Sequence, residues 1–290
     1  MAEHLWDLIL RPFTNTPDKE ALVLSEGNFT YGQLGQAALS ISTQLKADGV
    51  EGPFVGLYAH RDLTTYAGML GIMHAGHGYM PLHPELPQER LAAMLERSGT
   101  RAILTSREHA DGAIGLAERS GSKVHVIIAN TEVKGERSVE PCIQSPYAYL
   151  LFTSGSTGVP KGVPIRQSNV LAYLKEMERI AAPTATDRFT QLFEFTFDLS
   201  VHDIFLCWAA GGTLVVPSRE QLLAPAAFVR ANAITCWFAV PSMALLMDRM
   251  RTLKPGAMPS LRFSAFCGEP LPVDLVRKWS DAAPNSRLLN

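Results

Sequence analysis

Small polar residues and one lysine are concentrated between residues 153 and 161, directly after an apolar run. Four hydroxyl residues and two glycines precede Pro160 and Lys161, in the order Thr153, Ser154, Gly155, Ser156, Thr157 and Gly158. Glycines let backbone amides approach an anion without a Cβ atom in the way, and successive amides form an anion-binding concavity. The hydroxyl groups add donors, and Lys161 adds positive charge. The pattern predicts a loop that grips the phosphates of a polyphosphate ligand.

Two other interpretations of this loop are a flexible linker and a Walker phosphate loop. A linker is disfavoured because the stretch lies between a strand-like run at 149–152 and a Pro-Lys-Gly turn. The Walker motif is G-x-x-x-x-G-K-[ST]. Counted from Gly155, its second glycine position holds Pro160, and Gly162 stands where the Mg²⁺-binding hydroxyl belongs. The sequence therefore predicts a phosphate loop of another type.

The composition is that of an ordinary globular protein. The chain has 290 residues, of which 47% are hydrophobic and 19% charged, and its net charge is −2. This allows a sizeable core in one large α/β unit or about two domains, and gives no basic surface for nucleic acid or anionic membrane. The four cysteines form no CxxC pair, no two histidines have metal-ligand spacing, and no secretory signal is evident. We expect a cytoplasmic protein without a metal site among these residues.

The elements that must position the loop alternate between helix and strand patterns. Helical spacing of apolar residues is seen at 31–46 and 87–95, and Asp62 is expected to begin a helix that ends before Gly76. Strand-like runs lie at 54–59, 101–105 and 124–129. After the loop we expect a helix capped by Ser168, and the alternation resumes after Pro183. Such a series predicts an α/β fold of mostly parallel sheets with helices on their faces. A strand before the loop and a helix after it place the loop at the carboxyl edge of a sheet.

Five motifs, in order, resemble those of adenylate-forming enzymes, above all the amino-acid adenylation domains of nonribosomal peptide synthesis. Residues 30–34 resemble the TYxEL element, 74–91 the KAGxAYVPIDPxxPxxRI element, 149–162 the phosphate-loop signature, 197–200 the FDxS element and 266–271 the GGExL element. The resemblance implies stacked sheets of the large N-terminal core, with the C-terminal barrel and small lid domain absent. It suggests one subdomain from 1–53 and 190–290, and a second, carrying the phosphate loop, from 54–189.

The resemblance implies ATP-dependent activation of an amino acid. The products would be an aminoacyl-adenylate and pyrophosphate, and the acyl group would pass to the phosphopantetheine thiol of a carrier protein in peptide, antibiotic or related secondary-metabolite biosynthesis. Thr153 and Lys161 would be catalytic, and the whole loop from Thr153 to Lys161 would hold the phosphates. The adenine would contact Gly268, Glu269, Pro270 and Asn290. The Mg²⁺ ligand would lie beyond Asn290.

Asp198 is the residue that discriminates best among substrates. By resemblance it pairs with the substrate ammonium, and the side-chain pocket would be lined by Leu199, His202, Phe238, Ala265 and Cys267. A carboxylate deep among apolar neighbours needs a compensating cation, which an ammonium would supply. The residues alone equally allow Asp198 to cap the next turn. The apolar set favours a small or medium, uncharged amino-acid side chain.

Two alternatives remain open at the level of sequence. An aryl- or acyl-CoA ligase would not need Asp198, and an inactive nucleotide- or partner-binding fragment would need no complete site. The motifs stop at Asn290, where the resembling enzymes continue. The resemblance therefore implies a truncated portion with negligible adenylation activity by itself. A smaller departure is His83, where amino-acid activators usually have Asp.

Overall fold

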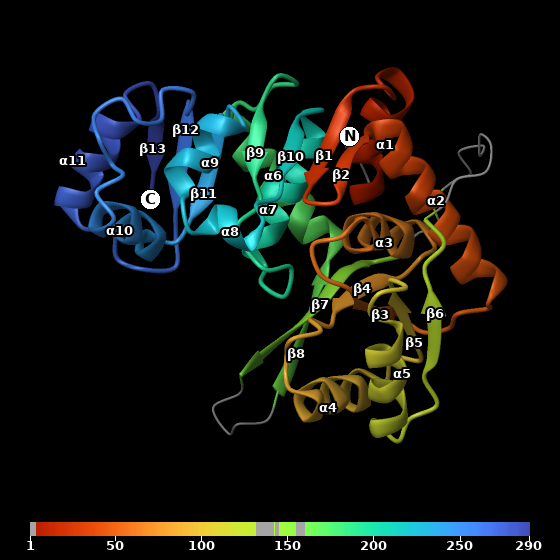
Figure 1. Ribbon diagram of the computed structural model, residues 1–290. Coiled ribbons are helices and arrows are strands. Elements are labelled where there is room, and N and C mark those ends of the chain that lie inside the picture. Colours follow the sequence, from red (N-terminus) through yellow and green to blue (C-terminus); the bar gives the residue numbers. More distant parts are fainter. Residues whose placement is uncertain (1–3, 132–141, 143–144, 155–159) are drawn as a thin grey trace. The chain divides into compact units, whose positions relative to one another are not determined.

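The computed structural model describes residues 4–131, 142, 145–154 and 160–290, which form two compact units (Figure 1). The first unit comprises Met1–Lys19, Phe29–Glu176 and Phe195–Asp198, and the second comprises Glu20–Asn28, Met177–Glu194 and Leu199–Asn290. Each unit is built on its own sheet. Across the described ranges, no helix is both long and apolar enough to cross a membrane.

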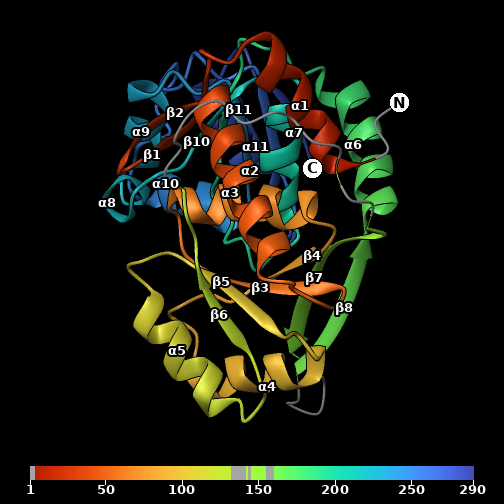
Figure 2. The same cartoon turned by 90° about the vertical axis from the view of Figure 1, so that its right-hand side faces the viewer.

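The first unit is built on a six-stranded sheet in the order β6-β5-β3-β4-β7-β8. Its strands are β3 (Phe54–Tyr58), β4 (Gly78–Pro81), β5 (Ala102–Thr105), β6 (His125–Ile128), β7 (Tyr147–Ser154) and β8 (Pro160–Arg166). Its helices are α1 (Leu5–Asn15), α2 (Tyr31–Ala47), α3 (Leu63–His74), α4 (Gln88–Ser98), α5 (Ala110–Arg119) and most of α6 (Gln167–Ala181). Helices α2 and α3 lie over one face of this sheet, and α4 and α5 cover the other (Figure 2).

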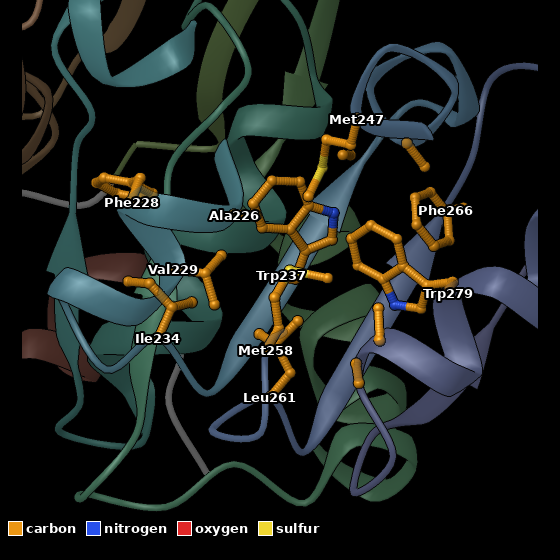
Figure 3. Close-up of a cluster of buried hydrophobic side chains, with 14 of the residues drawn as sticks. Ala226, Phe228, Val229, Ile234, Trp237, Met247, Met258, Leu261, Phe266 and Trp279 are labelled. Atoms are coloured by element: carbon orange, nitrogen blue, oxygen red, sulfur yellow. The ribbon is translucent and has the colours of Figure 1, made fainter. Parts of the chain in front are cut away.

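The second unit is built on a seven-stranded sheet in the order β13-β12-β11-β9-β10-β1-β2. Its strands are β1 (Glu20–Leu24), β2 (Gly27–Thr30), β9 (Arg188–Thr190), β10 (Thr213–Val215), β11 (Cys236–Ala239), β12 (Phe263–Phe266) and β13 (Arg287–Leu289). Its helices are α7 (Leu199–Ala209), α8 (Arg219–Leu222), α9 (Pro225–Ala231), α10 (Pro241–Arg249) and α11 (Val273–Ala282). The core packs Trp237 against Trp279, whose ring centroids are 5.6 Å apart (Figure 3). The expected α/β class is confirmed.

The units divide the chain differently from the subregions that the motifs suggested. Helix α2 belongs with the first unit, although 1–53 was expected to join 190–290. The physical reason is close packing of α2 on α3, which Gly71 permits. A Cβ atom at Gly71 would lie 2.7 Å from the Ala38 carbonyl oxygen and 2.8 Å from Cγ2 of Ile41. The two helices therefore pack as one pair.

Strand β8 corrects the expectation that a helix directly follows the phosphate loop. It pairs antiparallel with β7, so the loop connects the two strands of a hairpin. The strand was hidden because its seven residues include Pro160, Gly162 and Pro164. Proline is tolerated at a sheet edge, which is the position of β8 in this sheet.

The start of α6 also differs from the expected cap at Ser168, because the helix begins one residue earlier at Gln167. The buried Gln167 side chain accepts a hydrogen bond from the Leu5 amide at 2.9 Å. It also donates one to the Ser145 carbonyl oxygen at 3.1 Å. Tertiary contacts, rather than a local hydroxyl cap, thus fix this end of the helix.

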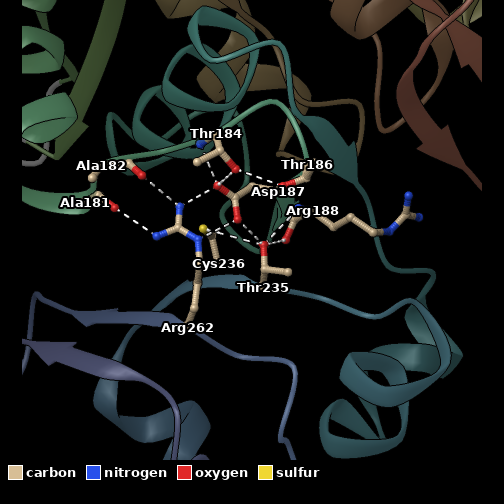
Figure 4. Close-up of polar contacts among 9 residues, drawn as sticks. All are labelled: Ala181, Ala182, Thr184, Thr186, Asp187, Arg188, Thr235, Cys236 and Arg262. Carbon is tan, nitrogen blue, oxygen red and sulfur yellow. Dashed lines mark hydrogen bonds and ion pairs between the residues drawn. The ribbon is translucent and has the colours of Figure 1, made fainter.

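An ion pair between the half-exposed Arg262 and the buried Asp187 ties the end of α6 to the sheet of the second unit (Figure 4). The carboxylate of Asp187 accepts from Nε of Arg262 at 2.6 Å and from the hydroxyl of Thr235 at 2.7 Å. Arg262 also donates to the carbonyl oxygens of Ala181 and Ala182, at 3.1 and 3.2 Å. These carbonyl groups have no partner within the helix, so the arginine caps α6 from a distance in sequence.

Candidate active site

A cavity of about 530 Å³ lies in the first unit against the β7–β8 hairpin. Alternate residues of β7, namely Tyr149, Leu151 and Thr153, line it together with Val163 and Ile165 of β8. Side chains alternate between the two faces of a strand, and directly opposed residues of an antiparallel pair share a face. The observed register places Tyr149 opposite Ile165 and Leu151 opposite Val163. The hairpin therefore presents one largely apolar face to the cavity.

Thr153 and Lys161 lie directly opposite each other, at the end of the hairpin where the loop begins. Both are exposed, and Thr153 lines the cavity. A hydroxyl and an ammonium group are thus placed side by side at one end of the hairpin. The other predicted phosphate-binding groups, which are the side chain of Ser154 and residues Gly155, Ser156, Thr157 and Gly158, lie outside the described residues.

Asp198 lines the same cavity as Thr153, beside Thr196 and Phe197. It is exposed, and 60% of Phe197 is exposed as well, so the expectation of a carboxylate deep in an apolar pocket is wrong. The charge of Asp198 still affects a neighbouring residue of the cavity wall, Tyr149. Burial, followed by the negative charge of Asp198, raises the pKa of the Tyr149 hydroxyl to about 12. The cavity therefore has an anionic site at Asp198 and a hydroxyl at Thr153, among mostly apolar surfaces.

In the second unit, three of the predicted side-chain pocket residues come together. The rings of His202 and Phe238 are 4.3 Å apart, and Phe238 is the register partner of Ala265 in the neighbouring strand. Burial lowers the pKa of His202 to about 4, so its imidazole is neutral at physiological pH. Leu199 begins α7 and is half-buried, while Cys267 follows β12 and donates its amide to the Ala239 carbonyl oxygen at 3.3 Å.

The predicted adenine segment follows β12 and is exposed on the second unit. Its Gly268 has a φ of 81°, a conformation that favours glycine. The Glu269 carboxylate accepts from the Ser242 amide at 2.8 Å and from its hydroxyl at 3.2 Å. This places a negative charge at the N-terminus of α10, where the helix dipole stabilises it. Pro270 and Asn290, the other predicted adenine contacts, are exposed too.

The whole chain was compared with known proteins. Residues 11–290 match the family described as AMP-binding enzyme. The chain belongs to this family. Over 285 aligned residues it is 33% identical to tyrocidine synthase 3 of Brevibacillus parabrevis, covering 95% of this chain and 4% of that protein. This AMP-binding chain thus spans only a small part of the length of that relative.

Solved structures agree with the family assignment. IdnL7 superposes with a TM-score of 0.88 at 30% identity, and 100% of this chain covers 61% of that one. The adenylation domain AlmE of Vibrio cholerae, in complex with glycyl-adenosine-5'-phosphate, superposes with a TM-score of 0.85 at 26% identity, covering 99% of this chain and 59% of that one. The matches of this AMP-binding chain include an adenylation domain and nonribosomal peptide synthetases such as FmoA3, which confirms the resemblance seen in the motifs.

Tyr149, Arg90 and Thr196 are among the cavity residues of this AMP-binding chain that were not predicted as site residues. Tyr149 could have been found from the period-two alternation with Leu151 and Thr153. Arg90 of α4 and Thr196 reach the cavity from other parts of the fold. Arg90 falls in the motif at 74–91, but no local pattern shows that it or Thr196 lines a cavity, because only the packing of α4 and of residues 195–198 brings them to the hairpin.

Proposed function

We propose that this chain forms the N-terminal part of an enzyme that activates an amino acid with ATP as an aminoacyl-adenylate. The observation that carries the proposal is that Thr153 and Asp198 line one cavity. Thr153 was predicted to hold phosphate and Asp198 to hold an ammonium group. Adenylation joins the carboxylate of the amino acid to a phosphate. The groups that hold the phosphate and the ammonium group must therefore lie no farther apart than one amino acid can span. The AlmE complex, which holds a glycyl-adenylate, supports this interpretation.

In the proposed reaction an oxygen of the substrate carboxylate attacks the α-phosphorus of ATP. The bond from that phosphorus to the bridging oxygen breaks, and pyrophosphate leaves with the electron pair. Lys161 and the hydroxyl of Thr153 stabilise the negative charge of the phosphates, and Asp198 holds the ammonium group so that the carboxylate points toward them. Mg²⁺, whose ligand we expect beyond Asn290, would neutralise phosphate charge when bound.

The wall formed by His202, Phe238 and Ala265 supports an uncharged substrate side chain. All three are buried, and the lowered pKa of His202 leaves that wall without a cation at neutral pH. An acidic or basic side chain would meet no fixed opposite charge among these three residues. In the second half-reaction, the activated acyl group would pass to the thiol of a carrier protein's phosphopantetheine arm.

Amino-acid-dependent exchange between ATP and pyrophosphate in the full-length protein that contains these residues tests the proposal. We expect Lys161→Ala and Asp198→Ala each to lower exchange about 100-fold, the size of effect typical of losing one charge-stabilising group. The matched controls are Lys175→Ala and Asp111→Ala, which remove the same charges from exposed helix positions. Exchange in these two should equal that of the unmodified protein.

Two outcomes would contradict amino-acid activation. If no amino acid, proteinogenic or not, supports exchange, the chain is a binding module rather than an activating enzyme. If Asp198→Ala retains full activity with a simple carboxylic acid, the enzyme belongs with the aryl- and acyl-CoA ligases, which have no ammonium group to hold.

A further inference from the structure

A second hollow, of about 450 Å³, lies in the first unit where the C-terminal end of α4 meets β8. Its polar wall is formed by Arg97, Ser98, Lys161 and Gly162, and its apolar wall by Phe54, Leu150 and Phe152. Apart from Lys161, no residue that lines this hollow was predicted as a site residue. Lys161 is directly opposite Thr153 in the hairpin. Because side chains alternate along a strand, Leu150 and Phe152 point away from the face of the hairpin that carries Leu151 and Thr153, so the hollow opens mainly on the other face.

The hollow depends on two glycines. A Cβ atom at Gly162 would lie 3.2 Å from Cδ1 of Leu150 and 3.2 Å from Cζ of Phe152, so a side chain there would press into the apolar wall. Gly99 ends α4 with a φ of 64°, a left-handed conformation typical of glycine after a helix. This end places Arg97 in the last turn of α4, at the rim of the hollow.

The charges of the hollow are unbalanced. Two of its lining residues are cations and none is a carboxylate. Within the described part of the chain, neither Arg97 nor Lys161 forms an ion pair, although exposed arginines such as Arg119 and Arg277 do. Two like charges facing one hollow repel each other unless an anion lies between them. Apolar walls on the other side strengthen the attraction for such an anion, because they lower the local dielectric constant.

We propose that Arg97 acts with Lys161 to bind a polyphosphate anion, namely the pyrophosphate that leaves ATP during adenylation. The choice of this anion rests on the function proposed above. Lys161, which the motif predicts to hold the phosphates of ATP, also lines this hollow, and Arg97 adds a second positive charge from α4. A planar guanidinium can donate two parallel hydrogen bonds to one phosphate group, which a lysine cannot. Arg97 is therefore a binding residue for the leaving group, and not for the amino acid.

Titration calorimetry with inorganic pyrophosphate, in the absence of ATP and amino acid, tests this site in the full chain. At low ionic strength we expect Arg97→Gln to raise the Kd for pyrophosphate about three- to fivefold, the effect of losing one largely exposed ion pair. Arg97→Lys should lose less, because it keeps the charge. The matched control is Arg101→Gln, which removes the same charge from an exposed residue at the start of the next strand. It lies outside the hollow and should leave the Kd unchanged.

The salt dependence gives a second readout. At about 1 M salt the difference between Arg97→Gln and the unmodified chain should vanish, because charges are then screened within about 3 Å. Equal affinities of Arg97→Gln and the unmodified chain at low salt would overturn the proposal, and so would an equal loss in Arg101→Gln. Equally tight binding of orthophosphate would overturn the assignment to a polyphosphate.

The failure of this site and the failure of the proposed function give different results. If pyrophosphate binding depends on Arg97 but no amino acid supports exchange, the anion site stands and amino-acid activation falls. If exchange depends on Asp198 but pyrophosphate binding ignores Arg97, only the role of Arg97 falls. Because Arg97 is exposed, its substitution should leave the circular dichroism spectrum and Tm unchanged, which separates lost binding from lost folding.

Discussion

Replacing Arg262 with alanine should destabilise the second unit more than any other single change of an exposed or half-exposed charge. Its partner Asp187 has a side chain that is only 2% exposed, while the side chain of Arg262 is 34% exposed. Without the arginine, a buried carboxylate loses its ion pair, and the carbonyl oxygens at the end of α6 lose two donors. The cost is therefore that of leaving a charge buried and unpaired.

The magnitude follows from what remains around the carboxylate. Breaking a fully buried ion pair costs about 3–5 kcal/mol. In Arg262→Ala, Asp187 would still accept from the Thr235 hydroxyl at 2.7 Å and from the Thr184 amide and hydroxyl, at 2.6 and 3.0 Å. Water would also enter the space that the half-exposed arginine leaves. We therefore expect a loss of about 2–4 kcal/mol in the free energy of unfolding.

The loss should depend on pH in a definite direction. Burial alone would raise the pKa of Asp187, but the hydrogen bonds from Arg262, Thr235 and Thr184 together hold it below the ordinary value of 3.8. A carboxyl whose pKa is lower in the folded state stabilises the fold above the unfolded pKa, and this contribution disappears as the pH falls through the folded pKa. The difference between Arg262→Ala and the unmodified chain should thus be largest near neutral pH and narrow below about pH 4.

Urea unfolding followed by tryptophan fluorescence measures this prediction. Trp208, Trp237 and Trp279 are all buried in the second unit, so their emission reports its unfolding. The control is Arg277→Ala, whose ion pair with Asp274 is exposed by 76% and 87% and should contribute less than about 1 kcal/mol. A loss below about 1 kcal/mol in Arg262→Ala, or a loss that does not narrow in acid, would refute the reasoning.

Two further predictions concern buried positions. Burial raises the pKa of the Asp203 carboxyl well above 3.8, so the unfolded chain ionises first and stability falls as the pH rises from about 4 toward 7. The Tm of Asp203→Asn minus that of the unmodified chain should therefore increase over this range, and a constant difference would contradict it. Gly71→Ala should lower stability by about 1–3 kcal/mol, because its Cβ would meet a backbone oxygen. Gly115→Ala, which meets open space within its helix, should instead raise stability by up to about 1 kcal/mol in the same urea titration, and equal signs would refute the packing argument.

Much of the fold could be predicted because its signals are local. Thr30 and Asp62 cap α2 and α3 with their own side chains, and α2 also has apolar residues at helical spacing. The parallel strands are short apolar runs, as expected for strands buried on both faces. By contrast, the two prolines and the glycine of β8 break the local strand pattern, and only its place at the sheet edge makes the strand possible.

The candidate site shows the same difference between residues that the local sequence identifies and properties that depend on tertiary packing. The motifs identified Thr153, Lys161 and Asp198 by residue type and order alone. They did not indicate that Asp198 is exposed, because burial depends on which segments pack around residues 195–198. They also omitted Arg97, since a single arginine in the last turn of an amphipathic helix is an ordinary surface residue.

The exposure of Asp198 changes the physical reason for expecting an ammonium group there. A buried carboxylate would need a cation at all times, whereas an exposed one is stabilised by water and needs none. The preference of Asp198 for an ammonium group must then come from the desolvation of the ligand. An amino acid that enters the cavity loses water from its ammonium group against apolar surfaces such as Phe197 and Leu151, and Asp198 is the carboxylate that lines this cavity. Discrimination against simple carboxylic acids would accordingly be produced on binding, when the ligand itself displaces water from Asp198.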